Sequence, residues 1–164
     1  MIGRARLRRA EQMDHPIKRK HPAEGVYIFP DQPTIAFLTV CSKDRQQKLA
    51  DAKVHEALVT AWQLADAWSV GSYLIMPDHI HLFCSPMDEE CTIEHWVTFW
   101  KRQFHRMFGP NAPRFQSRGF HHRLRQQEAY TEKWEYIRQN PVRAGLVTDS
   151  DDWIYQGKMN DLIW

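Results

Sequence analysis

Four segments of the chain have the residue types of β-strands. Residues 34–42, TIAFLTVCS, are rich in β-branched and aromatic side chains. Residues 70–76 and 79–85 are two further apolar runs, and the Met76-Pro77-Asp78 sequence around their junction is typical of a tight turn. These two runs are therefore predicted to form a hairpin, and a fourth strand is predicted over residues 120–125.

Three further segments carry apolar residues at helical spacing. Helices are predicted over residues 48–68, over residues 92–108 with Thr92 as N-cap, and over residues 127–139. The pairs Gly109-Pro110 and Asn140-Pro141 are expected to end the second and third helices. The apolar stripes are Val54, Leu58, Trp62 and Ala65 in the first helix, Ile93, Trp96, Val97, Trp100 and Phe104 in the second, and Tyr130, Trp134 and Ile137 in the third.

The predicted order of elements is β-α-β-β-α-β-α. This order favours an α+β fold, a ferredoxin-like sandwich in which helices pack on one face of an antiparallel sheet. A length of 164 residues suits a single domain. Residues 1–22 are predicted to be a basic N-terminal arm, and residues 23–164 the domain itself.

Composition excludes some protein classes. With 43% hydrophobic and 26% charged residues, the chain resembles an ordinary soluble protein. No apolar run approaches the roughly 20 residues of a membrane span, so no membrane partner is expected. Three cysteines without a CxxC pair argue against a disulfide framework or a zinc knuckle, and they fit a reducing cytoplasm.

The charge distribution is more informative than the net charge of +2. Residues 95–127 contain no Asp or Glu, and such a window favours a polyanionic partner over a merely solvated face. The basic residues of this window are Lys101, Arg102, Arg106, Arg114, Arg118, Arg123 and Arg125.

Two histidines alternate with apolar residues at the start of the third predicted strand. Because side chains alternate faces along a strand, His79 and His81 should share one face while Ile80 and Leu82 point into the opposite layer. Two imidazoles so placed are close enough to bind one cation. For an isolated HxH sequence, a pair of hydrogen-bonded or solvent-facing histidines is the more common alternative.

Tyr136 is the aromatic residue of the third helix that packing does not explain. It lies roughly 200° around the helix from Trp134, on the side that carries Glu132 and Asn140. One interpretation is an ordinary surface tyrosine. The other is a nucleophile, with Asn140 one turn later presenting its amide oxygen to the same cation.

Four stretches together resemble the REP-associated tyrosine transposases, relatives of the insertion-sequence-200 transposases in the HUH single-tyrosine nuclease superfamily. They are PDHIHLF, FQSRGFHHRLRQQEAY, WEYIRQNPVRAGLV and DDWIYQG. The resemblance runs from about Thr34 to the C-terminus. Family members usually carry an acidic residue where His121 stands, whereas His122 fits the pattern.

The resemblance implies a specific chemistry and location. His79, His81 and Asn140 would bind Mg²⁺ or Mn²⁺, and Tyr136 would be the nucleophile that cleaves single-stranded DNA beside a hairpin-forming repeat. The products would be a 5′-phosphotyrosine bond and a free 3′-OH. A bacterial cytoplasm is expected, and both a monomer and a homodimer remain open. The basic window would hold the DNA backbone, with Phe115 and Phe120 stacking on unpaired bases.

Two alternatives remain open. One is a DNA-hairpin-binding module of the same fold without catalytic activity. The other is a small-molecule phosphodiesterase that uses HxH as acid and base. That class needs a second histidine motif, and the only candidate, His121-His122, has adjacent rather than alternate spacing.

Overall fold

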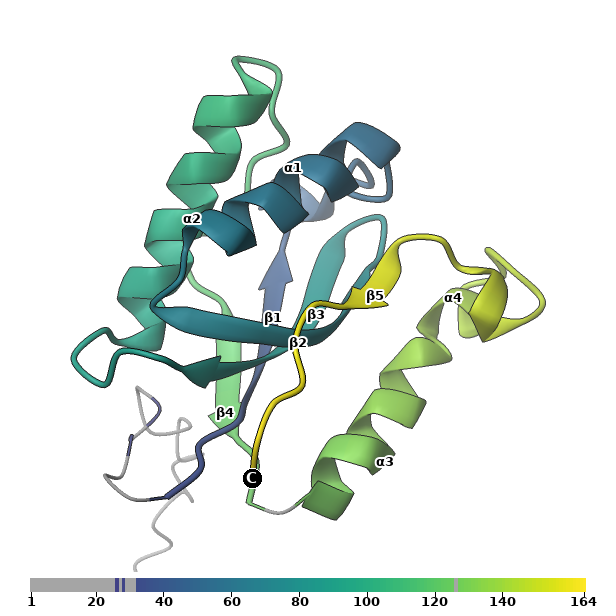
Figure 1. Cartoon of the computed structure of the whole chain (residues 1–164). Coiled ribbons are helices and arrows are strands. Elements are labelled where there is room, and N and C mark those ends of the chain that lie inside the picture. The colour runs from purple at the N-terminus through teal and green to yellow at the C-terminus, as the bar shows by residue number, and fades with distance from the viewer. Residues whose placement is uncertain (1–25, 27, 29–31, 126) are drawn as a thin grey trace, which may run out of the picture.

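A five-stranded antiparallel sheet forms the centre of the molecule (Figure 1). The computed structural model describes residues 26, 28, 32–125 and 127–164. The strands are β1 (Ala36–Cys41), β2 (Trp68–Ile75), β3 (His79–Pro86), β4 (Phe120–Arg123) and β5 (Gln156–Lys158), in the order β4-β1-β3-β2-β5. The predicted hairpin is confirmed as β2–β3, and its turn is closed by the Met76 N–H, which donates to the His79 carbonyl at 2.8 Å.

The helices begin at capping residues. In α1 (Ala52–Leu64), the Asp51 carboxylate accepts from the first-turn N–H groups, so the helix is shorter than the predicted 48–68 and Trp68 belongs to β2. In α2 (Ile93–Phe108), Thr92 is the cap as predicted, and Gly109 ends the helix at a φ of 93°. The third helix, α3 (Gln127–Arg138), precedes α4 (Asn140–Arg143).

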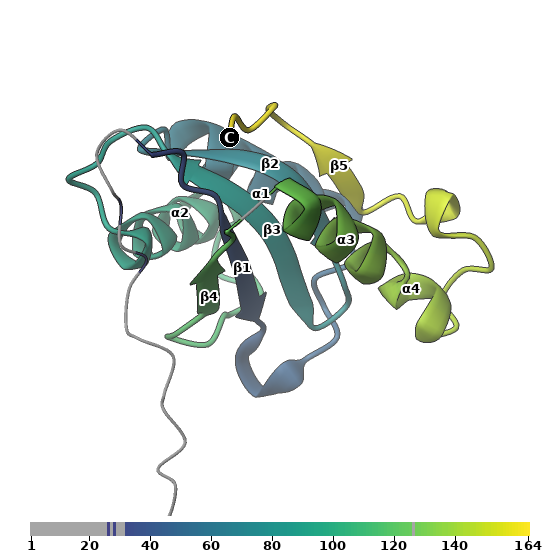
Figure 2. The ribbon, with the colours of Figure 1, turned by 90° about the horizontal axis from the view of Figure 1, so that it is seen from below.

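The two faces of the sheet are covered by different helices. Leu38, Ile80 and Leu82 pack with α1 and α2, including Trp96 and Trp100, which are 1% and 0% exposed. The expected α+β sandwich is thus confirmed, with an addition: α3 lies against the opposite face (Figure 2), because the side chains of the other parity on β1 and β3 are also apolar and need cover. The His79–His81 face of β3 is therefore the face that α3 covers.

Tyr130 anchors α3 to the sheet. Its ring lies 4.1 Å from that of Phe83, and its hydroxyl donates to the Ser72 hydroxyl at 2.9 Å. Gly71 permits this approach, since a Cβ there would come within 3.2 Å of the Tyr130 hydroxyl and 2.7 Å of Leu162. With Trp134 and Ile137, Tyr130 forms the predicted apolar stripe.

Some elements of the fold were not predicted from the sequence. Asn140-Pro141 does end α3, yet Pro141 then lies in the first turn of α4, where a missing N–H leaves no bond unmade. The three-residue strand β5 and the 3₁₀ turns η1 (Lys43–Arg45) and η2 (Ser150–Asp152) were not expected. The basic arm predicted at residues 1–22 lies outside the described residues. Of the described helices, none has the length and apolar composition needed to cross a membrane.

Candidate active site

His79 and His81 form a close pair on the α3 side of β3. Their ring centroids are 4.7 Å apart and the rings are nearly perpendicular. The alternation predicted for this strand is observed, because both histidines are partly exposed while Ile80 and Leu82 are 0% exposed in the opposite layer. His79 pairs with Cys41 at the end of β1, so the pair lies at the rim of the sheet.

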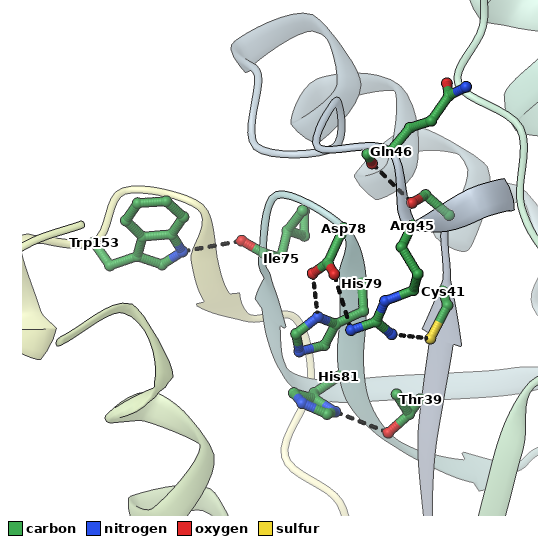
Figure 3. A network of polar contacts seen from close by, with 10 residues as sticks. Thr39, Cys41, Arg45, Gln46, Ile75, Asp78, His79, His81 and Trp153 are labelled. Atoms are coloured by element: carbon green, nitrogen blue, oxygen red, sulfur yellow. Dashed lines mark hydrogen bonds and ion pairs between the residues drawn. The ribbon is translucent and has the colours of Figure 1, made fainter. Parts of the chain in front are cut away.

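His79 is oriented by an adjacent carboxylate. Its Nδ1 donates to Asp78 Oδ1 at 2.6 Å, and the other Asp78 oxygen pairs with Arg45 at 2.8 Å (Figure 3). Burial opposes ionisation of Asp78, but the hydrogen bond and charge of His79 and the charge of Arg45 outweigh it and lower the pKa of the carboxyl. An ionised carboxylate only accepts, so Nδ1 of His79 carries a proton and Nε2 is the nitrogen that faces away from Asp78.

His81 is also held through Nδ1, by a hydroxyl that can donate or accept. Its Nδ1 is 2.8 Å from Thr39 Oγ1, and its ring stacks on Phe37 with centroids 5.3 Å apart. Burial lowers the pKa of His81 to about 3, and the neighbouring charges of His79, Lys133 and Arg45 act in the same direction. His81 is therefore a neutral imidazole at physiological pH.

The two Nε2 atoms are left for a ligand. In the described part of the chain, neither atom makes a hydrogen bond, since both rings are bonded through Nδ1. Figure 3 shows the two remaining nitrogens on the same side of the pair, away from Asp78 and Thr39. Neutral imidazoles fixed through Nδ1 are the usual form of metal-binding histidines.

Tyr136 lies on α3 and is 68% exposed. Among described residues its ring contacts Arg143, whose guanidinium carbon is 4.4 Å from the ring centroid, and neither imidazole. Tyr136 does share a side of the helix with Lys133, one turn earlier, and Lys133 Nζ lies 4.4 Å from the Phe37 ring beside His81. The phenol thus faces solvent, on the side of α3 that also carries Lys133.

Asn140 stands at the start of α4, and its amide oxygen accepts a short hydrogen bond from Arg143. No three His, Cys, Asp or Glu side chains converge on a possible metal position within the described residues. A cation here would therefore take its ligands from the two imidazoles, the Asn140 amide, DNA phosphate and water. Imidazole favours Mn²⁺ over Mg²⁺ in such a mixed set.

The predicted DNA-binding cations do not form one continuous track. Lys101, Arg102 and Arg106 lie on α2, behind the sheet as seen from the histidines. Arg114 and Arg118 lie in the loop that joins α2 to β4 at the histidine end of the sheet, where Lys43 N–H bonds the Arg114 carbonyl. At the other end of β4, Arg123 contacts the Pro33 carbonyl and Arg125 is exposed.

The aromatic residues proposed for base stacking also differ in position. Phe115 packs edge-on against Trp100 and Phe104 at 5.5 and 5.4 Å, which places it among the core residues. Phe120 is 52% exposed and lies beside the His122 ring, so it has a surface available for stacking.

The adjacent histidines of β4 point to opposite faces. His121 bonds Glu94 on α2 at 3.0 Å, whereas His122 lies next to Phe37 on the α3 face. Glu132 is exposed on α3. His121 therefore belongs to the layer away from the paired imidazoles.

Five residues of the site were not identified from the sequence: Thr39, Arg45, Asp78, Lys133 and Arg143. Asp78 directly precedes His79, and Arg143 belongs to the NPVR segment, so both lay within the stretches already singled out. Thr39 and Arg45 come from other segments and depend on the strand register and on a loop conformation.

Comparison with solved structures finds this architecture in a REP-associated tyrosine transposase bound to a REP hairpin. The TM-score is 0.63 at 20% sequence identity, over 79% of this chain and 81% of the other. The chain has the fold of a REP-associated tyrosine transposase. A second structure, a candidate transposase from Deinococcus radiodurans R1, has a TM-score of 0.48 at 16% identity, over 66% of this chain and 91% of the other, and adds no argument.

In comparisons by sequence, no protein-family model and no curated protein matches the chain. The likeness to the transposase concerns the fold, and the roles of individual residues rest on the geometry described above.

Proposed function

We propose that this protein is a metal-dependent nuclease and strand transferase that cleaves single-stranded DNA beside a hairpin, through a phosphotyrosine intermediate. The observation that carries the proposal is the His79–His81 pair, in which each imidazole is held through Nδ1 and keeps Nε2 for a shared ligand. The solved transposase of the same fold is bound to a REP hairpin, which supports a DNA hairpin as the ligand of this chain.

A divalent cation bound by the two imidazoles would neutralise charge on the non-bridging oxygens of the phosphate. Asp78 and Thr39 orient the two rings, and Asn140 would add its amide oxygen after Arg143 releases it. Burial keeps His81 neutral, which is the form that can donate its lone pair.

Tyr136 would act as the nucleophile. Its phenol oxygen attacks phosphorus and forms the tyrosine–phosphate bond, while the bond from phosphorus to the 3′ oxygen breaks. The phenol proton ends, by way of solvent, on the departing 3′-OH. The 5′ end stays linked to the protein, and attack by a 3′-OH then reverses the step and rejoins strands. The exposure of Tyr136 supports this role, because an extended DNA strand can reach it.

The second candidate is a DNA-hairpin-binding module of the same fold without catalytic activity. It is favoured by two contacts: the Asn140 amide is occupied by Arg143, and the Tyr136 ring lies against Arg143 rather than the imidazoles. A hairpin-binding module would need neither group.

Incubation with hairpin DNA carrying single-stranded flanks, in the presence of Mn²⁺, separates the two candidates. Denaturing electrophoresis should show a protein–DNA adduct that is absent for Tyr136→Phe. His79→Ala and His81→Ala should abolish the adduct and leave hairpin binding largely intact. Specific binding without adduct, under every divalent metal tried, would instead favour the binding module.

A further inference from the structure

Lys133 is a cation placed beside the paired histidines, and among the described residues it has no acidic partner. Its ammonium lies over the Phe37 ring at 4.4 Å, and Phe37 in turn contacts both His81 and His122. Burial is the main cause of the lowered pKa of His81 and of His122. The charge of Lys133 lowers both further, as expected for a nearby cation.

The described residues near this ammonium offer it no carboxylate. An α-helix offers ion-pair partners three and four positions away, and those positions around Lys133 hold Ala129, Tyr130, Tyr136 and Ile137. No ion pair to Lys133 occurs among the described residues. The face of Phe37 attracts the charge but accepts none of its three N–H donors in a full hydrogen bond.

The charge of the whole cluster is also unbalanced. Arg45 and Lys133 are positive, and the one carboxylate among the groups that act on His81, Asp78, is already bonded to Arg45 and His79. The excess of positive charge therefore favours the binding of a further anion at this place. This anion should enter on the side of α3 that carries Tyr136, one turn after Lys133.

We propose that Lys133 binds a phosphate of single-stranded DNA at the histidine pair, and so positions the strand for Tyr136. This inference rests on the proposed function for the identity of the anion. It assigns Lys133 a separate role from the cations of α2, which lie behind the sheet. A point cation suits this task because a tetrahedral phosphate can approach it from several directions.

The test measures DNA binding in the Tyr136→Phe background, so that no strand is cut. Hairpin DNA with single-stranded flanks is titrated by fluorescence anisotropy at a series of salt concentrations. Lys133→Met keeps an unbranched apolar side chain of similar length and removes the charge. Lys133→Arg keeps the charge. Lys158→Met is the matched control, because Lys158 is a lysine on β5 that pairs with Asp161.

Loss of one phosphate contact should lower the slope of log K against log salt by about 0.7 in Lys133→Met. Lys133→Arg should keep the slope of its Tyr136→Phe parent, and so should Lys158→Met. A neutral methylphosphonate is then placed at each flank position in turn. At the contacted position, Lys133→Met should cause no further loss of affinity beyond about twofold, because the partner charge is already gone.

An unchanged slope in Lys133→Met overturns the inference, and so does an equal fall in Lys158→Met. It is also overturned when no methylphosphonate position removes the effect of Lys133→Met. These outcomes are independent of catalysis. If Tyr136-containing protein binds DNA but forms no adduct, the nuclease proposal fails while the binding test of Lys133 still stands.

Discussion

The guanidinium of Arg143 lies over the ring of Tyr136, with 4.4 Å between the guanidinium carbon and the ring centroid. The same side chain donates to the Tyr136 carbonyl at 2.8 Å and to the Asn140 amide oxygen. Arg143 thus connects the proposed nucleophile on α3 with the proposed metal ligand on α4. Both of these residues are held in one arrangement before DNA arrives.

Arg143→Ala should slow adduct formation. The ring of Tyr136 loses a cation–π contact and the end of α3 loses a hydrogen bond, so the phenol is held less firmly for attack. We expect this loss to outweigh the earlier release of the Asn140 amide and to lower the rate roughly five- to tenfold. Single-turnover measurements at saturating DNA would report this rate. Arg143→Lys keeps the charge without the planar fork and should remain slow. A wild-type rate in Arg143→Ala would show that this contact does not position the nucleophile.

The two tyrosines of α3 should separate stability from chemistry. Tyr130→Phe removes the hydroxyl that bonds Ser72 and should lower the free energy of unfolding by about 1–3 kcal/mol, while adduct still forms. Tyr136→Phe changes an exposed residue and should stay within about 0.5 kcal/mol of wild type, yet form no adduct. Urea unfolding and denaturing electrophoresis test both variants. The reverse pattern would show that Tyr130, and not Tyr136, is the nucleophile.

Asp78→Asn should weaken metal activation. The carboxylate that orients His79 and favours its Nε2 as a ligand is lost, and removal of such a partner typically costs about 10–100-fold in metal affinity. The Mn²⁺ concentration that gives half-maximal adduct should rise accordingly. Asp161→Asn, which affects a surface ion pair with Lys158, is the control. Equal Mn²⁺ requirements in Asp78→Asn and wild type would mean that the Asp78 carboxylate does not prepare His79 for metal binding.

Lys101 should make DNA binding dependent on pH. Burial lowers the pKa of Lys101 to about 8. The side-chain amine donates a hydrogen bond to the Gln116 carbonyl. The side chain is mostly cationic at pH 7 and loses its charge as the pH rises through 8, so affinity should fall between pH 7 and 9. Anisotropy at constant ionic strength measures this fall. Lys101→Met should bind more weakly at pH 7 and with a flatter profile, and an identical profile would remove Lys101 from the DNA contacts.

Local periodicity was sufficient to predict the parts of the site that lie within single elements. Alternation along β3 placed both histidines on one face, and the helical period separated Tyr136 from the packed Tyr130. These deductions need only the geometry of one strand or one helix.

The remaining parts depend on how distant segments meet. Thr39 reaches His81 through the register of β1 against β3, and Arg45 reaches Asp78 from a turn in which Asp44 and Arg45 both have positive φ, at 56° and 54°. The basic window of residues 95–127 is continuous in sequence but not in space, because α2 packs on one face of the sheet whereas β4 is a strand of the sheet itself. Charge spacing along the chain contains no information on layers.

The most direct test of the central claim is mass spectrometry of the adduct formed with Mn²⁺ and hairpin DNA, after digestion of both protein and DNA. We expect one modified peptide, with a nucleotide 5′-phosphate joined to the Tyr136 oxygen. A nucleotide attached to any other residue, or intact DNA recovered from a fully bound complex, would contradict it.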